Sequence, residues 1–154
     1  MLPPRLVLML ALAQAACTTL ANDTVEDPTT GLNETVFKCK VEPILVAQCS
    51  YNACHGNPLS ALRVYSIGKL RAVPPTDLDA AASPLSNAEH HANYLSAAGF
   101  AALTDLPANN WLLRKPLPPN DGGYEHKGGA IYTGPADPQY AAITQWLTGA
   151  TSCN

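Results

Sequence analysis

Beyond residue 33, apolar residues recur mostly at helical intervals, and few segments alternate with a period of two residues. The clearest helix lies near the C-terminus, where Asp137 supplies an N-cap, Pro138 fits the first helical position and Gly149 ends the element. No segment predicts a sizeable sheet. The pattern therefore indicates a mainly α fold.

An earlier helix is expected where Val36, Phe37 and Val41 fall near helical spacing. Pro43 should bend or restart the chain before residues 44–49, because proline cannot donate the next helical hydrogen bond. This first helix therefore ends where the most distinctive residues of the chain begin.

Two further helices are expected, over residues 88–103, which are rich in alanine and leucine, and over residues 109–115, which Pro116 stops. We expect ordinary helix packing for Trp146, whereas Tyr140 either packs in the same way or contacts a cofactor. The 14 prolines and 10 glycines predict long loops between the helices, and so a small core.

Residues 1–16 are typical of a signal peptide, with Arg5, then a short apolar run, then small residues. The run is too short to span a membrane. Cleavage after Ala15 would give a soluble secreted or periplasmic protein. Alternatively, the residues around Cys17 resemble a bacterial lipobox, and a lipidated Cys17 would anchor the protein to a membrane. Both outcomes place the chain outside the cytoplasm.

Residues 17–32 are polar and contain Pro28 and Gly31, which predicts a flexible tether. Residues 33–154, roughly 120 in all, suffice for one small domain. The net charge of -3 argues against a nucleic-acid partner.

Cys49 is followed after four residues by Cys54, and His55 comes directly after it. Two thiols with an adjacent imidazole form the arrangement that attaches a c-type haem. The thiols add to the porphyrin vinyl groups, and the histidine then coordinates the iron. The pattern therefore predicts one covalently attached haem c, with His55 as the proximal ligand. The usual spacing leaves two residues between the cysteines, so this is a wider variant.

Two other interpretations of this motif remain open. Cys49 and Cys54 could form a local disulfide or stay free, with His55 merely following them. A zinc site could use the two thiolates and the imidazole, although the nearby sequence offers no fourth ligand.

The second axial ligand is not methionine, because Met1 and Met9 both lie in the predicted signal peptide. His126 is the favoured candidate, since its glycine-rich loop over residues 121–129 lets backbone approach a flat group closely. The alternatives are a surface histidine at this position and an empty sixth coordination site. His90 and His91, adjacent on a predicted helix, are weaker candidates and would otherwise be solvated.

Cys39 and Cys153 remain after the other cysteines are assigned, and in an oxidising compartment they are expected to pair. Such a disulfide would join the first helix to the C-terminal end. A Cys39–Cys49 bridge is the alternative, and it would remove a haem thiol. Scattered basic residues form either a docking face or simply solvated positions, namely Lys38, Lys40, Lys69, Arg71, Arg114, Lys115 and Lys127.

Together these residues resemble a bacterial family of exported, often membrane-associated, cytochrome c-like domains. The resemblance runs from Phe37 to about Gly149. It implies the cytochrome c fold, in which N- and C-terminal helices pack across one another beside a haem. The motifs that carry it are Val41-Glu42-Pro43-Ile44-Leu45, Cys54-His55-Gly56, Leu112 to Leu117, Gly122-Gly123, His126-Lys127-Gly128-Gly129 and the closing helix from Tyr140 to Gly149.

The first functional hypothesis is an electron-transfer protein that binds one haem and serves a redox partner protein. The second is a binding module that keeps the scaffold, lacks haem and is stabilised by disulfides. An enzyme such as a small haem peroxidase is a third interpretation, although no convergent acid–base groups are evident. We therefore expect an electron carrier more than an enzyme.

Overall fold

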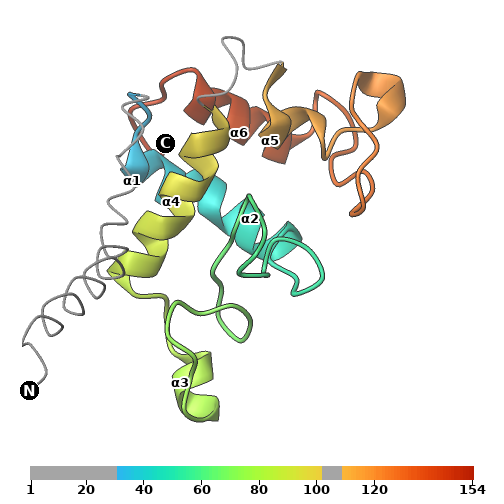
Figure 1. Cartoon of the computed structure of the whole chain (residues 1–154). Helices are drawn as coiled ribbons and strands as arrows, with labels where there is room; N and C mark the ends of the chain where they lie inside the picture. Colours follow the sequence, from blue (N-terminus) through green and yellow to red (C-terminus); the bar gives the residue numbers. More distant parts are fainter. Residues whose placement is uncertain (1–30, 102–108) are drawn as a thin grey trace, which may run out of the picture.

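The computed structural model describes residues 31–101 and 109–154. The predicted signal peptide, Cys17 and most of the tether lie outside these residues, as does the end of the helix expected over 88–103. Within them all regular structure is helical and no strand is present, which confirms the mainly α prediction (Figure 1). None of the helices in these two segments has the length and hydropathy that crossing a membrane requires.

The first helix comprises three consecutive parts: α1 (Glu34–Val36), the π-helical segment η1 (Phe37–Val41) and α2 (Glu42–Gln48). Asn33 caps its start, because its side-chain oxygen accepts the N–H of Val36 at 3.0 Å. The helix regains α geometry at Glu42, one residue before Pro43, where the sequence predicts that the chain bends or restarts. The π-helical turn lies before Pro43, which has no N–H to donate. The helix therefore continues past the proline without a break.

Each of the other helices expected from the sequence is present: α4 (Asn87–Ala101), α5 (Trp111–Arg114) and α6 (Pro138–Leu147). Ser86 and Glu89 form a reciprocal capping box at the start of α4, with N···O distances of 2.8 and 3.2 Å. The side chain of Asp137 accepts the N–H of Gln139 at 2.8 Å and so caps α6. Local capping chemistry therefore determines where these helices begin.

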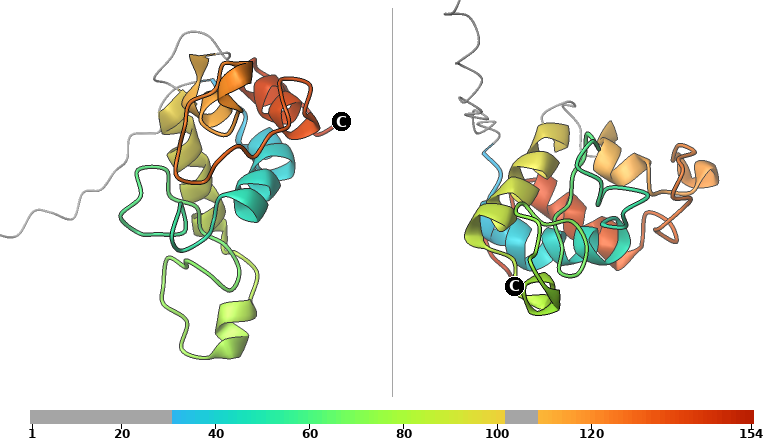
Figure 2. Two further views of the ribbon diagram at one scale, coloured as in Figure 1. Left: turned by 90° about the vertical axis from the view of Figure 1, so that its right-hand side faces the viewer. Right: turned by 60° about the horizontal axis from the view of Figure 1, so that its bottom comes forward.

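Two short helical segments were not predicted, α3 (Leu78–Ala82) and the 3-10 turn η3 (Pro119–Asp121). Asp77 caps α3 by accepting the N–H of Ala80 at 2.8 Å. Figures 1 and 2 show α3 at the tip of a loop that projects away from the other helices. Leu78 is 87% exposed there, so α3 contributes nothing to the core.

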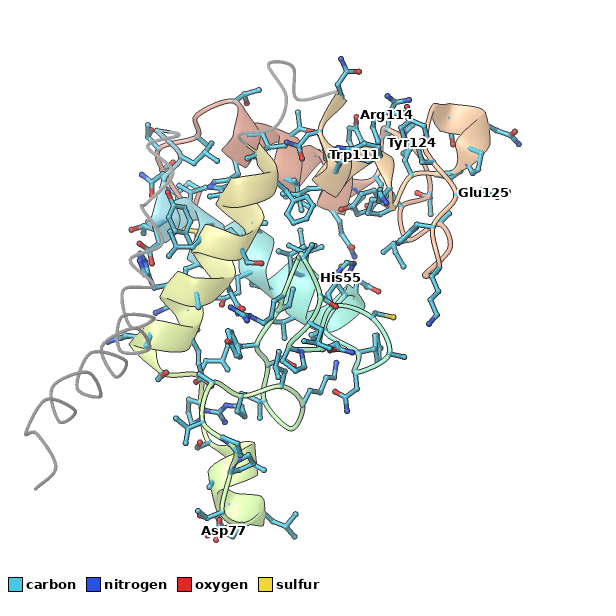
Figure 3. The ribbon with its side chains drawn as sticks, viewed as in Figure 1. His55, Asp77, Trp111, Arg114, Tyr124 and Glu125 are labelled. Atoms are coloured by element: carbon cyan, nitrogen blue, oxygen red, sulfur yellow. A yellow bond between two sulfur atoms is a disulfide. The ribbon has the colours of Figure 1, made fainter. Side chains whose placement is uncertain are left out.

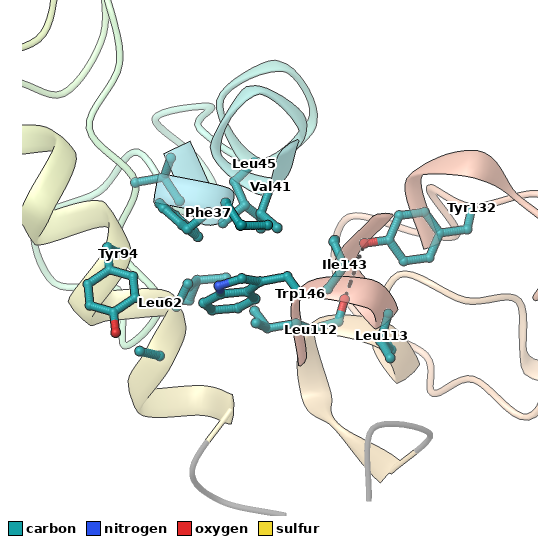
Figure 4. Packing of buried hydrophobic residues seen from close by; sticks show 14 of the residues in the cluster. Phe37, Val41, Leu45, Leu62, Tyr94, Leu112, Leu113, Tyr132, Ile143 and Trp146 are labelled. Atoms are coloured by element: carbon teal, nitrogen blue, oxygen red, sulfur yellow. Dashed lines mark hydrogen bonds between the residues drawn. The ribbon is translucent and has the colours of Figure 1, made fainter. Parts of the chain in front are cut away.

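The core is centred where the first helix, α4 and α6 meet (Figure 4). Phe37 lies 5.3 Å from Trp146 and 5.8 Å from Tyr94 between ring centroids. Trp146 is fully buried, and its indole N–H donates to the carbonyl of Asn33 at 3.1 Å. Trp146 therefore packs between helices, as expected, and joins the first helix to the last.

A disulfide joins Cys39 of the first helix to Cys153 near the C-terminus, with a Cα–Cα distance of 6.0 Å. The alternative Cys39–Cys49 bridge is not formed, because Cys49 is unpaired. The first and last helices are thus connected both covalently and through the aromatic core.

The loop that carries α3 is attached to α4 through Arg71, whose guanidinium contacts both carboxylate oxygens of Glu89 at 2.9 and 3.0 Å. Arg71 also donates to the carbonyls of Ser83 and Ala80. Glu89 is 3% exposed, so the pair is shielded from water. Arg71 is therefore part of a buried ion pair and is neither a solvated nor a docking residue.

Candidate functional site

Cys49 and Cys54 lie in a compact turn directly after α2. Cys49 is the C-cap of that helix, and its N–H donates to the carbonyl of Leu45 at 2.9 Å. The carbonyl of Tyr51 accepts the N–H of Cys54 at 2.8 Å, and the carbonyl of Cys49 accepts the N–H of His55 at 3.1 Å. Both thiols are half-buried and unpaired, so the local disulfide is not formed.

Gly56 closes this turn in a position with no room for a side chain. A Cβ atom there would lie 2.1 Å from the carbonyl oxygen of Ser50. The N–H of Gly56 also donates to the carbonyl of Tyr51 at 3.0 Å. The glycine after His55 is therefore needed for the backbone to fold back on itself.

The imidazole of His55 is held through one of its two nitrogen atoms. Its Nδ1 atom lies 2.8 Å from the carbonyl oxygen of Leu62. Since a carbonyl only accepts, Nδ1 carries the proton and Nε2 keeps its lone pair. A backbone bond of this kind fixes the tautomer and orientation of a metal-binding histidine. Figure 3 shows His55 on the loop that follows α2.

The surroundings of Cys49 favour its protonated thiol. Burial, followed by the neighbouring Cys54, raises the pKa of the Cys49 thiol to about 11. Cys49 is therefore protonated at neutral pH, which makes it a slow partner in thiol exchange.

Tyr132 is a second buried group beside Cys49. Burial first, and then the proximity of Cys49, raises the pKa of its phenol. Its hydroxyl donates to the carbonyl of Leu112 at 3.2 Å, and its ring meets that of Tyr140 at 5.8 Å between centroids. Tyr140 thus packs against a residue that itself lies beside the cysteine turn.

His126 lies on a loop that is fixed at one end to the last residue of α5 and at the other to the segment after it. The N–H of Tyr124 donates to the carbonyl of Arg114 at 3.0 Å, and the N–H of Ile131 donates to the carbonyl of Pro116 at 2.7 Å. Gly123 sits where a Cβ atom would be 1.9 Å from the carbonyl oxygen of Leu117. These contacts give the loop a defined path, which Figure 3 shows at Tyr124 and Glu125.

The imidazole of His126 is half-buried, and within residues 31–101 and 109–154 its Nδ1 atom is buried without a hydrogen-bond partner. Burial is the main cause that lowers its pKa, with smaller electrostatic contributions from His55 and Lys115. The lowered pKa keeps His126 neutral at neutral pH, the form that binds metals.

His90 and His91 are directed to the first helix instead. Nδ1 of His90 lies 2.7 Å from a carboxylate oxygen of Glu42, and Nδ1 of His91 lies 3.0 Å from one of Glu34. Asn93 donates to the other oxygen of Glu42 at 2.7 Å. Both histidines therefore pair with acidic side chains and connect α4 to the first helix.

An open hollow of about 480 Å³ adjoins the loop that carries His126. It is lined by Leu117, Pro119, Tyr124, Glu125, His126, Gly129 and Ala130. The side of His126 that faces this hollow is accessible to small molecules.

In the described part of the chain, no three His, Cys, Asp or Glu side chains gather as ligands for a metal ion. A structural zinc site uses four protein ligands, whereas a haem iron needs one or two because the porphyrin supplies the rest. The donors in this region are His55, whose imidazole is held by a backbone carbonyl, and two unpaired thiols. The described residues therefore contain no complete ligand set for a structural zinc ion, and they do contain the residue types that a haem c requires.

Comparison with protein-family models, with curated proteins and with solved structures finds no match to this chain. The evidence for its function therefore comes from its own residues.

Sequence reasoning did not identify the carbonyl of Leu62, the side chain of Lys69 or Tyr132 as parts of this region. The contact with Leu62 uses a backbone carbonyl, which every residue has, so the residue type at this position does not indicate it. Lys69 donates from its Nζ atom to the hydroxyl of Ser50 at 2.9 Å. Lys69 and Tyr132 reach the cysteine turn only through the tertiary fold.

Proposed function

We propose that this protein binds one haem covalently through Cys49 and Cys54 and transfers electrons, with His55 as the proximal ligand of the iron. The observation that carries the proposal is the 2.8 Å contact between Nδ1 of His55 and the carbonyl of Leu62. It leaves Nε2 available for the iron, next to two unpaired thiols.

The packing of the helices supports a cytochrome c-like arrangement. The first helix ends at the cysteine turn, and its residue Phe37 packs against Trp146 of the last helix. The turn therefore begins from a rigid helix that the rest of the core holds in place. A rigid support keeps the ligand geometry constant between oxidation states.

When bound, the haem would supply a reversible change between ferric and ferrous iron. His55 would bind the iron, Leu62 would hold the imidazole in the required orientation, and Tyr132 would help to exclude water. His126 is the proposed second ligand, because its lowered pKa favours the neutral imidazole and its Nδ1 atom is buried without a hydrogen-bond partner among the described residues. Two imidazole ligands would give a lower potential than a histidine–methionine pair.

Export of the chain is also proposed. The disulfide between Cys39 and Cys153 supports it, because such bonds persist in oxidising compartments. Cleavage after Ala15 and lipidation at Cys17 are both compatible with this proposal. The redox partner would then be a protein of the same compartment.

A potentiometric titration of the protein produced with haem attachment machinery tests the proposed function. We expect a one-electron Nernstian transition, followed in the visible spectrum, that is the same in the reductive and oxidative directions. His55→Ala should abolish this transition. His91→Ala is the control and should retain the transition, because His91 pairs with Glu34 at an exposed position. A wild-type protein without a reversible transition would contradict electron transfer.

A haem-free binding module is the alternative function, and one observation favours it. The aromatic core and the Cys39–Cys153 disulfide hold the helices together through residues outside the cysteine turn. A stable fold without haem would then remain for binding a partner. Absence of haem from protein made in the presence of the attachment machinery distinguishes this alternative.

A further inference from the structure

The turn between Cys49 and Cys54 has two more residues than the usual attachment motif. A longer loop has more conformations, so it presents both sulfur atoms together less often. Both thiols must nevertheless reach fixed positions on one rigid porphyrin. An additional constraint on this turn would compensate for its length.

Lys69 supplies such a constraint from a distant part of the chain. Its Nζ atom donates to the hydroxyl of Ser50 at 2.9 Å and lies 4.1 Å from the ring centroid of Tyr51. Ser50 and Tyr51 are the first two of the four residues between the cysteines. Lys69 therefore holds the first half of the wide turn.

The contacts of Ser50 and Tyr51 continue to the rest of the turn. Ser50 is fully buried, and its hydroxyl donates to the carbonyl of Val46 in α2. The carbonyl of Tyr51 accepts the N–H groups of both Cys54 and Gly56. Fixing these two residues thus fixes the backbone on which Cys54 is mounted.

Lys69 is itself presented by a defined turn. The N–H of Ser66 donates to the carbonyl of Leu70 at 3.0 Å, and the N–H of Lys69 donates to the carbonyl of Ser66 at 3.2 Å. Gly68 has a φ of +70° and donates to the carbonyl of Ala81 at 3.0 Å. The turn is therefore anchored to α3, which gives the projecting loop a role in the site.

We propose that Lys69 is a positioning residue that holds the wide Cys49–Cys54 turn in the conformation needed for two thioether bonds to one haem. This inference rests on the proposed function for its haem-attachment role. The contacts with Ser50 and Tyr51 are called the Lys69 clasp below.

The first test compares Lys69→Met with wild type after export of the full chain together with attachment machinery. Peptide mass spectrometry would measure the fraction of haem-bearing protein in which one of the two cysteines remains free, and the reduced pyridine spectrum would report the unreacted vinyl group. Since the lysine makes a hydrogen bond of the charged type, we expect this fraction to rise by about tenfold. Lys69→Arg should restore double attachment, because arginine keeps both the donor and the cation–π contact.

Lys38→Met is the matched control, because Lys38 is exposed on the first helix and the charge change is the same. It should leave both thioether bonds intact. A Lys69→Met protein with the wild-type proportion of double attachment would overturn the proposal.

A second test uses the full chain expressed without attachment machinery. Hydrogen exchange at the amides of Cys54 and Gly56 should be about tenfold faster in Lys69→Met, whereas amides of α4 should be unchanged. Unchanged exchange rates at both amides would show that Lys69 does not hold the turn. If wild-type protein never acquires haem, both the proposed function and the role of Lys69 in haem attachment fail. The exchange rates then still show whether Lys69 holds the turn in its folded conformation.

Discussion

The Nδ1 atom of His55 and the carbonyl oxygen of Leu62 lie 2.8 Å apart, across seven positions of sequence. In the neutral imidazole the contact assigns the proton to Nδ1 and leaves the lone pair on Nε2. The contact also brings Leu62, which follows the cysteine turn, back against the imidazole of His55. The backbone of His55 is held by the turn, and its side chain is held by Leu62. A histidine that merely followed two cysteines would not require this bond.

Replacing His126 should open the sixth coordination position. In His126→Ala we expect the ferrous protein to bind carbon monoxide rapidly, because no second imidazole has to be displaced. Wild type should bind it slowly or not at all. His90→Ala is a suitable comparison, because His90 pairs with Glu42. Equal carbon monoxide binding by wild type and His126→Ala would show that His126 is not a ligand.

Gly56 and Gly99 form a pair of substitutions with opposite expected effects. Gly56→Ala places a Cβ atom 2.1 Å from the carbonyl oxygen of Ser50, whereas Gly99→Ala in α4 meets nothing within 4 Å. We expect Gly56→Ala to lower the free energy of unfolding by about 2 kcal/mol or more and Gly99→Ala to raise it by about 0.5–1 kcal/mol. Denaturant unfolding of both variants measures this, and a neutral Gly56→Ala would contradict the described turn.

The disulfide should contribute strongly to stability, because it closes a loop between residues 114 positions apart. Replacing both Cys39 and Cys153 by serine should cost about 4–5 kcal/mol in the chain-entropy description. The midpoint of urea unfolding checks this value. The same variant should still expose the thiols of Cys49 and Cys54 to a thiol reagent after unfolding. A variant as stable as wild type would argue against the pairing.

Acid should weaken the attachment of the α3 loop to α4. The hydrogen bonds from Arg71 are the main cause that lowers the pKa of Glu89 from 4.5 to about 2, while burial acts in the opposite direction. Because the folded-state pKa is the lower one, the stabilisation is complete above about pH 4.5 and is lost as the pH falls toward 2.

In Glu89→Gln this part of the pH dependence should disappear. The free energy of unfolding at pH 7 should fall by an amount on the order of 2 kcal/mol. Thermal unfolding between pH 2 and 7 measures it. Asp79→Asn, on the exposed helix α3, is the control with the same change of charge. Parallel pH profiles for wild type and Glu89→Gln would contradict the role of the ion pair.

The helices were predictable because their ends carry local signals. Asp137 caps α6, and Pro43 lies in the first turn of α2, the helix that directly follows the π-helical segment; both effects depend on neighbouring residues only. The helix α3 was missed because its five residues lie in a loop rich in turn residues, where periodicity is not measurable.

The candidate site was predictable only in part. Cys49, Cys54 and His55 lie within one short stretch of sequence, so their chemistry is visible there. The contacts of Lys69 with Ser50 and of Arg71 with Glu89 are not visible there, because they join residues 19 and 18 positions apart with no common pattern. A set of basic residues that looks scattered in the sequence thus includes specific contacts that only the tertiary fold reveals.

Covalent haem attachment is the central claim, and the most direct test is the mass of the protein exported together with haem attachment machinery, before and after acidic organic extraction. We expect a mass increase of one haem that survives extraction in wild type and is lost in a Cys49→Ser, Cys54→Ser double variant. A colourless wild-type protein, or one whose haem is fully extracted, would contradict the account and leave the haem-free binding module.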